Sequence, residues 1–256
     1  WRSIFLILDV GSDVAPGVTT PDGSNPFKDI RVRKALSLSI DRNAIVNKLM
    51  GGLATVASQF APSYQEGADS SMPDMAYDPD MAKKLLAEAG YSDSITLDLN
   101  VPNDRYQNGT RVAQAIAQYF TRIGVKVNLK AEPWSVFRKG RSGREFGIFM
   151  YGWGHPQGPA QMLSYAFPSR NKELNLGGSN YSNYQNADLD AAMEKWAVET
   201  DEAKAFAYNQ EAMRIAVEEL PGIPLYYQHS IWAHTSDISV AGRPDERTFA
   251  EMATKN

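Results

Sequence analysis

Residues 25–42 read NPFKDIRVRKALSLSIDR and predict the first helix of the chain. Val32, Leu36 and Ile40 recur every four residues, a spacing that keeps apolar side chains on one face of a helix. Asp29 stands just before this pattern, where its carboxylate can accept the free backbone N–H groups of a first helical turn. The stretch therefore predicts a capped helix with one face packed on a core.

Predicted helices and strands alternate along the rest of the chain. The predicted strands are short apolar or alternating runs, and the predicted helices have an apolar stripe between a capping residue and a glycine. We expect strands at 4–8, 95–101, 125–131, 146–151 and 223–232. We expect helices at 29–40, 41–50, 78–90, 111–123, 187–198 and 201–219, and a short one starting near Pro133. This order predicts an α/β fold with a mixed or parallel sheet, and residues 152–159, rich in Gly and Pro, predict a loop.

Composition limits the function classes. Hydrophobic residues make up 43% of the 256 residues and charged residues 22%, so the chain can form a core. The net charge is -4 and there is no basic cluster, so the usual source of affinity for nucleic acid is missing. The basic run at 138–144 reads as a solvated helix face. The absence of cysteine excludes disulfides, thiolate metal sites and cysteine nucleophiles from this chain.

No motif predicts catalysis, a cofactor or a metal. Gly152, Gly154 and Gly158 lack the spacing of a dinucleotide-binding loop, and prolines interrupt them. His229 and His234 are five apart in a predicted strand, so they point to opposite faces and cannot bind one metal ion together. We find no activated nucleophile and no paired acids, and we therefore predict that the chain is not an enzyme.

Six segments, in order, resemble the family-5 bacterial extracellular solute-binding proteins, the oligopeptide-, dipeptide- and nickel-binding receptors of ABC importers. The first is residues 25–42, which match the family pattern PF-x-D-x-R-V-R-x-A-L…I-D-R at every named position. The other segments lie at 77–91, 123–134, 146–153, 180–190 and 223–227. Together they extend over nearly the whole chain.

The resemblance implies a periplasmic-binding-protein-like lobe of type II, which is α/β with a mixed sheet flanked by helices. Members of the family are longer and fold as two lobes. We therefore expect residues 1–12 to be a crossover strand from lobe one, 13–228 to be the second, ligand-binding lobe, and 229–256 to return toward lobe one. These crossover segments would belong to a first lobe outside this chain, and a signal peptide would lie upstream.

The function implied by the resemblance is that of the extracytoplasmic receptor of an ABC importer. Such a receptor, a monomer in its full-length form, closes on a peptide or peptide-like solute and delivers it to the permease subunits. It would be periplasmic or extracytoplasmic and reach the membrane through the transporter. Two alternatives stay open: the same fold binding an oligosaccharide, an opine-like compound or a metal chelate, and, more remotely, a hydrolase.

Eight residues are candidates for ligand binding: Trp134, Tyr151, Gly152, Trp153, Gly154, His155, Asn180 and Tyr181. The resemblance implies that Trp134 and Trp153 face the cleft, where each offers a flat apolar surface and one N–H donor. Gly152 and Gly154 would let a ligand backbone approach closely, and His155 could form a hydrogen bond with the ligand. The alternative is that both tryptophans belong to the core.

The sequence departs from the peptide-binding pattern after Trp153. Peptide binders of the family have an aspartate there, which pairs with the α-ammonium of the peptide, but residues 154–159 read GHPQGP. Met150 stands where some members have an arginine near the ligand carboxylate. A buried ammonium without a counter-charge is costly, so either another acid serves or the ligand has no free amino group at that point.

Overall fold

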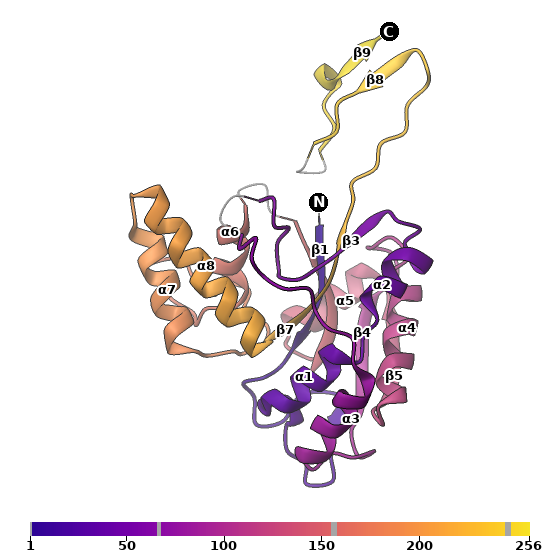
Figure 1. Cartoon of the computed structure of the whole chain (residues 1–256), viewed down its shortest axis with the longest axis vertical. Helices are drawn as coiled ribbons and strands as arrows, with labels where there is room; N and C mark the ends of the chain where they lie inside the picture. The colour runs from indigo at the N-terminus through magenta and orange to yellow at the C-terminus, as the bar shows by residue number, and fades with distance from the viewer. Residues whose placement is uncertain (1, 66–67, 155–157, 244–246) are drawn as a thin grey trace.

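In the computed structural model, which describes residues 2–65, 68–154, 158–243 and 247–256, seven strands form one mixed sheet between layers of helices (Figure 1). The strands of this sheet are β1 (Arg2–Leu8), β2 (Val18–Thr19), β3 (Ala54–Val56), β4 (Thr96–Pro102), β5 (Lys126–Glu132), β6 (Ile148–Trp153) and β7 (Gly222–Gln228). Their order is β2-β4-β6-β1-β7-β3, with β5 paired to β4. The sheet is mixed because β4 runs parallel to β5 and β6, whereas β1 runs antiparallel to β6 and β7.

The helices follow the predicted order with additions. The long ones are α1 (Ile30–Leu38), α3 (Pro79–Glu88), α4 (Gly109–Arg122), α5 (Trp134–Ser142), α6 (Pro159–Ala166), α7 (Ala187–Val198) and α8 (Glu202–Glu219). The short ones are η1 (Pro26–Lys28), α2 (Arg42–Ala44), η2 (Ile45–Leu49) and η3 (Ala250–Met252). The predicted caps Asp29 and Asp78 accept the N–H groups of Arg31 and Met81 at 2.8 and 2.9 Å.

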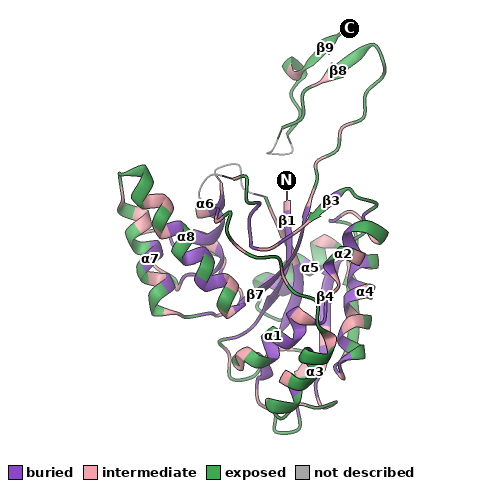
Figure 2. Ribbon diagram, in the orientation of Figure 1, coloured by how far each residue is buried: buried purple, intermediate pink, exposed green. Residues whose placement is uncertain are grey.

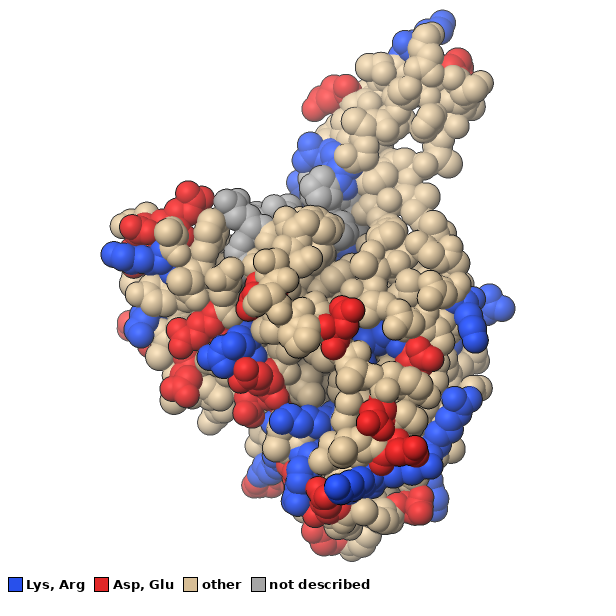
Figure 3. All heavy atoms as spheres, viewed as in Figure 1, with Lys and Arg blue, Asp and Glu red and all other residues tan. Residues whose placement is uncertain are grey.

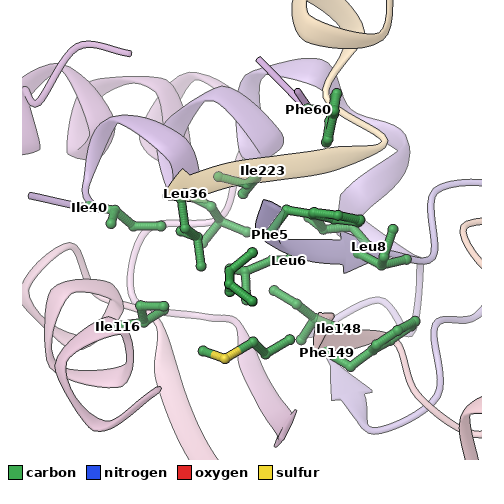
Figure 4. Packing of buried hydrophobic residues seen from close by; sticks show 14 of the residues in the cluster. Phe5, Leu6, Leu8, Leu36, Ile40, Phe60, Ile116, Ile148, Phe149 and Ile223 are labelled. Carbon is green, nitrogen blue, oxygen red and sulfur yellow. The ribbon is translucent and has the colours of Figure 1, made fainter. Parts of the chain in front are cut away.

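Strand β1 lies in the middle of the sheet and is buried on both faces. Its residues Ile4–Leu8 are at most 2% exposed, which is the environment in which a strand reads as a continuous apolar run. Leu6 packs among Leu36, Ile116 and other apolar side chains of α1, α4 and β6 (Figure 4). Phe5 points to the opposite face and contacts Phe60 with ring centroids 5.5 Å apart.

The two faces of the sheet have different coverings. Helices α1 and α4 lie over the face of Leu6, and α3 packs on α1. Phe137 of α5 contacts Phe149 of β6 on the face of Phe5, at 6.0 Å between ring centroids. Helices α7 and α8 pack together to one side of the sheet, with their buried sides turned toward the body (Figure 2). The α/β fold with a mixed sheet flanked by helices is therefore confirmed.

Several element boundaries were predicted wrongly. Gly152 and Trp153 are the last residues of β6 and not part of a loop, because they continue the antiparallel pairing with Ile4 and Ser3 of β1. Helix α6, which was not predicted, begins at Pro159, a residue suited to a first helical position.

Two further elements differ from the prediction. The predicted strand 223–232 ends at Gln228, so His229 and His234 lie outside it. The helix predicted at 41–50 is an α-helical turn followed by the π-helical η2, in which the N–H of Met50 bonds to the carbonyl of Ile45.

The described residues 229–243 and 247–256 leave the body as an extended segment in which β8 (Ile238–Val240) and β9 (Ala253–Lys255) pair antiparallel (Figure 1). Most of its described residues are exposed. The boundaries proposed at residues 12 and 228 stay predictions. The structure adds that residues 2–8, expected as a crossover strand, are hydrogen-bonded within this sheet.

The surface shows no gathering of one sign of charge on the side drawn in Figure 3, where acidic and basic side chains are interspersed. Within the described residues, no helix has the length and apolar character needed to cross a membrane.

The cap of α3 can be tested by substitution. Asp78→Ala removes the carboxylate that accepts the Met81 N–H and should lower the free energy of unfolding by about 1 kcal/mol. Asp80→Ala, in the same helical turn but outside the cap position, should change it by less than about 0.5 kcal/mol, because the higher helix propensity of Ala offsets the lost interaction with the helix N-terminus. Urea unfolding followed by circular dichroism measures both, and equal effects would contradict the assigned cap.

Candidate ligand-binding surface

Aromatic side chains gather at the end of β6. Tyr151 and Trp153 are two residues apart in this strand and therefore lie on the same face of the sheet. Their ring centroids are 5.6 Å apart, and Tyr151 also contacts Tyr181 at 6.4 Å. On its other side, Trp153 lies nearly parallel to Tyr165 of α6, at 6.4 Å and 12°. All four side chains are partly exposed, so the cluster forms a surface.

Arg141 of α5 lies within this cluster. The central carbon of its guanidinium is 4.8 Å from the ring centroid of Tyr181, 4.9 Å from that of Tyr151 and 5.4 Å from that of Trp134. Arg141 is only 9% exposed, and its Nε has no hydrogen-bond partner in the part of the chain that the structure describes. No carboxylate among the described residues forms an ion pair with it. The cluster thus contains a buried cation without a counter-charge.

The prediction of a solvated face at 138–144 was wrong for Arg141. Helix α5 buries Phe137, Gly140 and Arg141, which are three and four residues apart and share one face. The position of Phe137, four residues before Arg141, was a sequence signal that could have identified this arginine.

Trp134, the first residue of α5, has contacts on several sides. Its backbone N–H donates to Oδ1 of Asp104 at 2.7 Å, and its ring stacks on Phe137 at 5.7 Å. Arg105 lies over the same ring at 4.9 Å. Trp134 is partly buried by these groups and borders the cluster through Arg141.

Packing inside the fold gives a reason for a glycine at position 152, besides the predicted close approach of a ligand backbone. A Cβ at this position would lie 2.5 Å from Cε1 of Tyr106 and 2.7 Å from Cδ1 of Ile4, so a side chain would collide with the core. The Gly152 N–H donates to the hydroxyl of Tyr106 at 2.7 Å. The close approach is therefore made by Tyr106, and this N–H has a partner within the fold. Gly154 is exposed, and His155 lies outside the described residues.

Asn180 is buried and has its hydrogen bonds inside the fold. Its Nδ2 donates to the carbonyls of Phe167, Pro168 and Tyr184, and its Oδ1 accepts from the Ser182 hydroxyl and the Tyr184 N–H. This side chain holds the loop that contains Tyr181. Of the predicted residues, the structure thus brings together Trp134, Tyr151, Trp153 and Tyr181, and it gives Gly152 and Asn180 structural roles.

The electrostatics of the cluster favour an anion. Burial raises the pKa of the Tyr151 hydroxyl, and the nearby Arg141 guanidinium opposes this rise. Arg105 and Arg141 flank Trp134, whereas the nearby acid, Asp104, has its Oδ1 on the Trp134 N–H. A guanidinium forms two parallel hydrogen bonds with a carboxylate, so this surface is suited to a solute with a carboxylate group.

Comparison with known proteins agrees with the fold and the family pattern. Residues 12–175 match the family model of bacterial extracellular solute-binding proteins, family 5 Middle. The chain is 30% identical over 217 residues to di/tripeptide-binding protein 2 of Pseudomonas aeruginosa, a match over 84% of this chain and 40% of the relative. It is 32% identical over 211 residues to heme-binding protein A of Haemophilus influenzae, over 80% of this chain and 37% of the relative.

A solved structure has the same fold. The ABC transporter-associated periplasmic binding protein DppA from Helicobacter pylori, in complex with the peptide STSA, matches with a TM-score of 0.79 at 20% identity. The match covers 93% of this chain and 44% of the other. The chain thus spans about two fifths of the length of the curated relatives that it matches.

Because Arg141 has no acidic partner among the described residues, we predict that replacing it changes stability little. Arg141→Met should change the free energy of unfolding by less than about 1 kcal/mol, because it removes a buried charge that has no counter-charge. Arg33 is the matched control, since it is equally buried but bonds to the carbonyls of Phe27 and Lys28 and to Glu219. Arg33→Met should cost about 3 kcal/mol. Urea unfolding measures both, and a larger loss for Arg141→Met would indicate a structural role.

Proposed function

Because the chain belongs to the family-5 bacterial extracellular solute-binding proteins, we propose that it is the ligand-side lobe of a receptor that captures a peptide or peptide-like solute for an ABC importer. The support from relatives is that one is named for binding di- and tripeptides and that a protein of the same fold is described in complex with a peptide. Those proteins are more than twice as long as this chain, so the activity of a whole receptor is part of the proposal.

The observation that supports peptide capture best is the surface formed by Trp153, Tyr151, Tyr181 and Arg141. The aromatic rings offer flat apolar area against which varied side chains can pack. Arg141 has an unbonded Nε and no acidic partner among the described residues. A protein keeps such an arrangement at a cost in stability, and binding of a carboxylate would supply the missing counter-charge.

The amino end of the solute has no acidic partner in this cluster. Asp104, the carboxylate that contacts Trp134, already accepts the Trp134 N–H. We therefore propose that this lobe recognises a carboxylate end and apolar side chains, and that it places no demand on a free α-ammonium.

Membership of the family also supports a proposal for where the protein acts and for its permease partner. The related structure is described as periplasmic and as associated with an ABC transporter. We propose that this lobe likewise acts outside the cytoplasm, without catalysis, and passes its solute to membrane permease subunits.

Binding can be tested with the 256-residue chain and tri-alanine. One lobe alone forms an open cleft, so the affinity will be low and millimolar peptide with ¹⁵N NMR detection is suitable. The indole N–H signals of Trp134 and Trp153 should shift, whereas those of Trp196 in α7 and Trp232 in the terminal segment should not. Haemin and maltotriose serve as non-peptide probes. No shift with tri-alanine, beside a shift at Trp153 with either of these, would contradict peptide capture.

The contributions of the amino and carboxyl ends of the peptide to binding can be tested separately with blocked peptides. N-acetyl-tri-alanine should bind within about threefold of tri-alanine, because no acid of the cluster pairs with the ammonium. Tri-alanine amide should bind about tenfold more weakly, because it lacks the carboxylate that Arg141 would bind. In Arg141→Met this difference should disappear. Calorimetric or NMR titration gives the five dissociation constants, three for wild type and two for Arg141→Met, and weaker binding of the acetylated peptide alone would reverse the proposed orientation.

A further inference from the structure

Among the described residues, no strand pairs with the end of β6 on the side away from β1. Strand β4 pairs with β6 only at Leu99–Ile148 and Asn100–Phe149, whereas β1 pairs with β6 as far as Trp153. Residues 150–153 therefore have a strand edge without a ladder partner, and edge N–H groups need another acceptor. This edge contains Tyr151 and Trp153 of the proposed ligand surface.

Tyr106 supplies an acceptor at this edge. Its hydroxyl accepts the Gly152 N–H at 2.7 Å, and its ring lies where a Cβ of residue 152 would be, 2.5 Å from Cε1. Tyr106 is only 6% exposed. Because side chains alternate along a strand, the Gly152 side that faces Tyr106 is opposite to the side of Tyr151 and Trp153. Tyr106 thus contacts the strand from behind the ligand surface.

The loop that contains Tyr106 is itself anchored on several elements. Asp104 accepts the N–H of Trp134 in α5, and the N–H of Gln107 donates to the side chain of Gln228 in β7 at 3.3 Å. Asn108 donates from Nδ2 to the carbonyl of Leu49 at 2.9 Å. These bonds hold the backbone on both sides of Tyr106, so its hydroxyl has a fixed position relative to α5 and β7.

We infer that Tyr106 is a positioning residue for solute binding. It holds the end of β6 through the Gly152 N–H, at a set distance from Trp134, and so places Trp153 and Tyr151 without touching the solute. The inference rests on the proposed function for its effect on affinity. Its structural part, that the Tyr106 hydroxyl protects the Gly152 amide, is independent of any ligand.

The experiment compares Tyr106→Phe with wild type and with Tyr226→Phe. Tyr226 is a suitable control because it is also buried, in the adjacent part of the sheet, and its hydroxyl has no hydrogen-bond partner in the described structure. Tyr106→Phe keeps the ring in place and removes only the acceptor. Amide exchange at Gly152, read from ¹⁵N NMR spectra, should become about five- to tenfold faster, and tri-alanine should bind about three- to tenfold more weakly. Tyr226→Phe should change neither quantity.

The outcomes are distinct. An unchanged exchange rate at Gly152 in Tyr106→Phe overturns the inference whatever tri-alanine does. Faster exchange with unchanged tri-alanine affinity overturns the positioning role and leaves Tyr106 a structural residue. No tri-alanine binding by wild type overturns the proposed function and, with it, the effect on affinity, whereas the exchange comparison still decides whether Tyr106 holds the strand. A global loss of stability would speed exchange at many amides, so a change limited to residues 151–153 supports the inference.

Discussion

The pairing of β1 with both β6 and β7 is the interaction on which the rest of the structure depends. It joins residues at the start of the described chain to strands that lie about 150 and 220 residues later in the sequence. Because β1 is buried on both faces, its position also determines where the helical layers pack. The proposed ligand surface lies at one end of this pairing, where Ser3 of β1 is opposite Trp153 of β6.

Local chemistry made much of the fold predictable from the sequence. Caps such as Asp78 and the apolar run of β1 act through neighbouring residues or simple periodicity, so their pattern is visible in a short window. Helix α6 was missed because its Gly- and Pro-rich start resembles a loop. The roles of Gly152 and Arg141 depend on Tyr106, Tyr151 and other residues distant in sequence, and periodicity alone does not bring these together.

The proposed ligand surface contains aromatic side chains that are held by their neighbours and one buried charge, that of Arg141. Trp153 is held between Tyr151 and Tyr165, and Trp134 is held by Phe137 and two guanidinium groups, so little order need be gained when a solute binds. Arg141 is different, because its charge is buried and lacks a carboxylate partner among the described residues. Its contacts are with the rings of Trp134, Tyr151 and Tyr181, and none of these groups carries a negative charge, so a solute carboxylate would supply the counter-charge.

The central claim is that a solute carboxylate reaches Arg141 beside Trp153. A crystal structure of the chain soaked with tri-alanine tests it most directly. We expect that the terminal carboxylate lies about 2.8 Å from guanidinium nitrogens of Arg141 and that the peptide packs along the Trp153 ring. A peptide bound on another surface, or one whose ammonium rather than carboxylate end lies at Arg141, would contradict it.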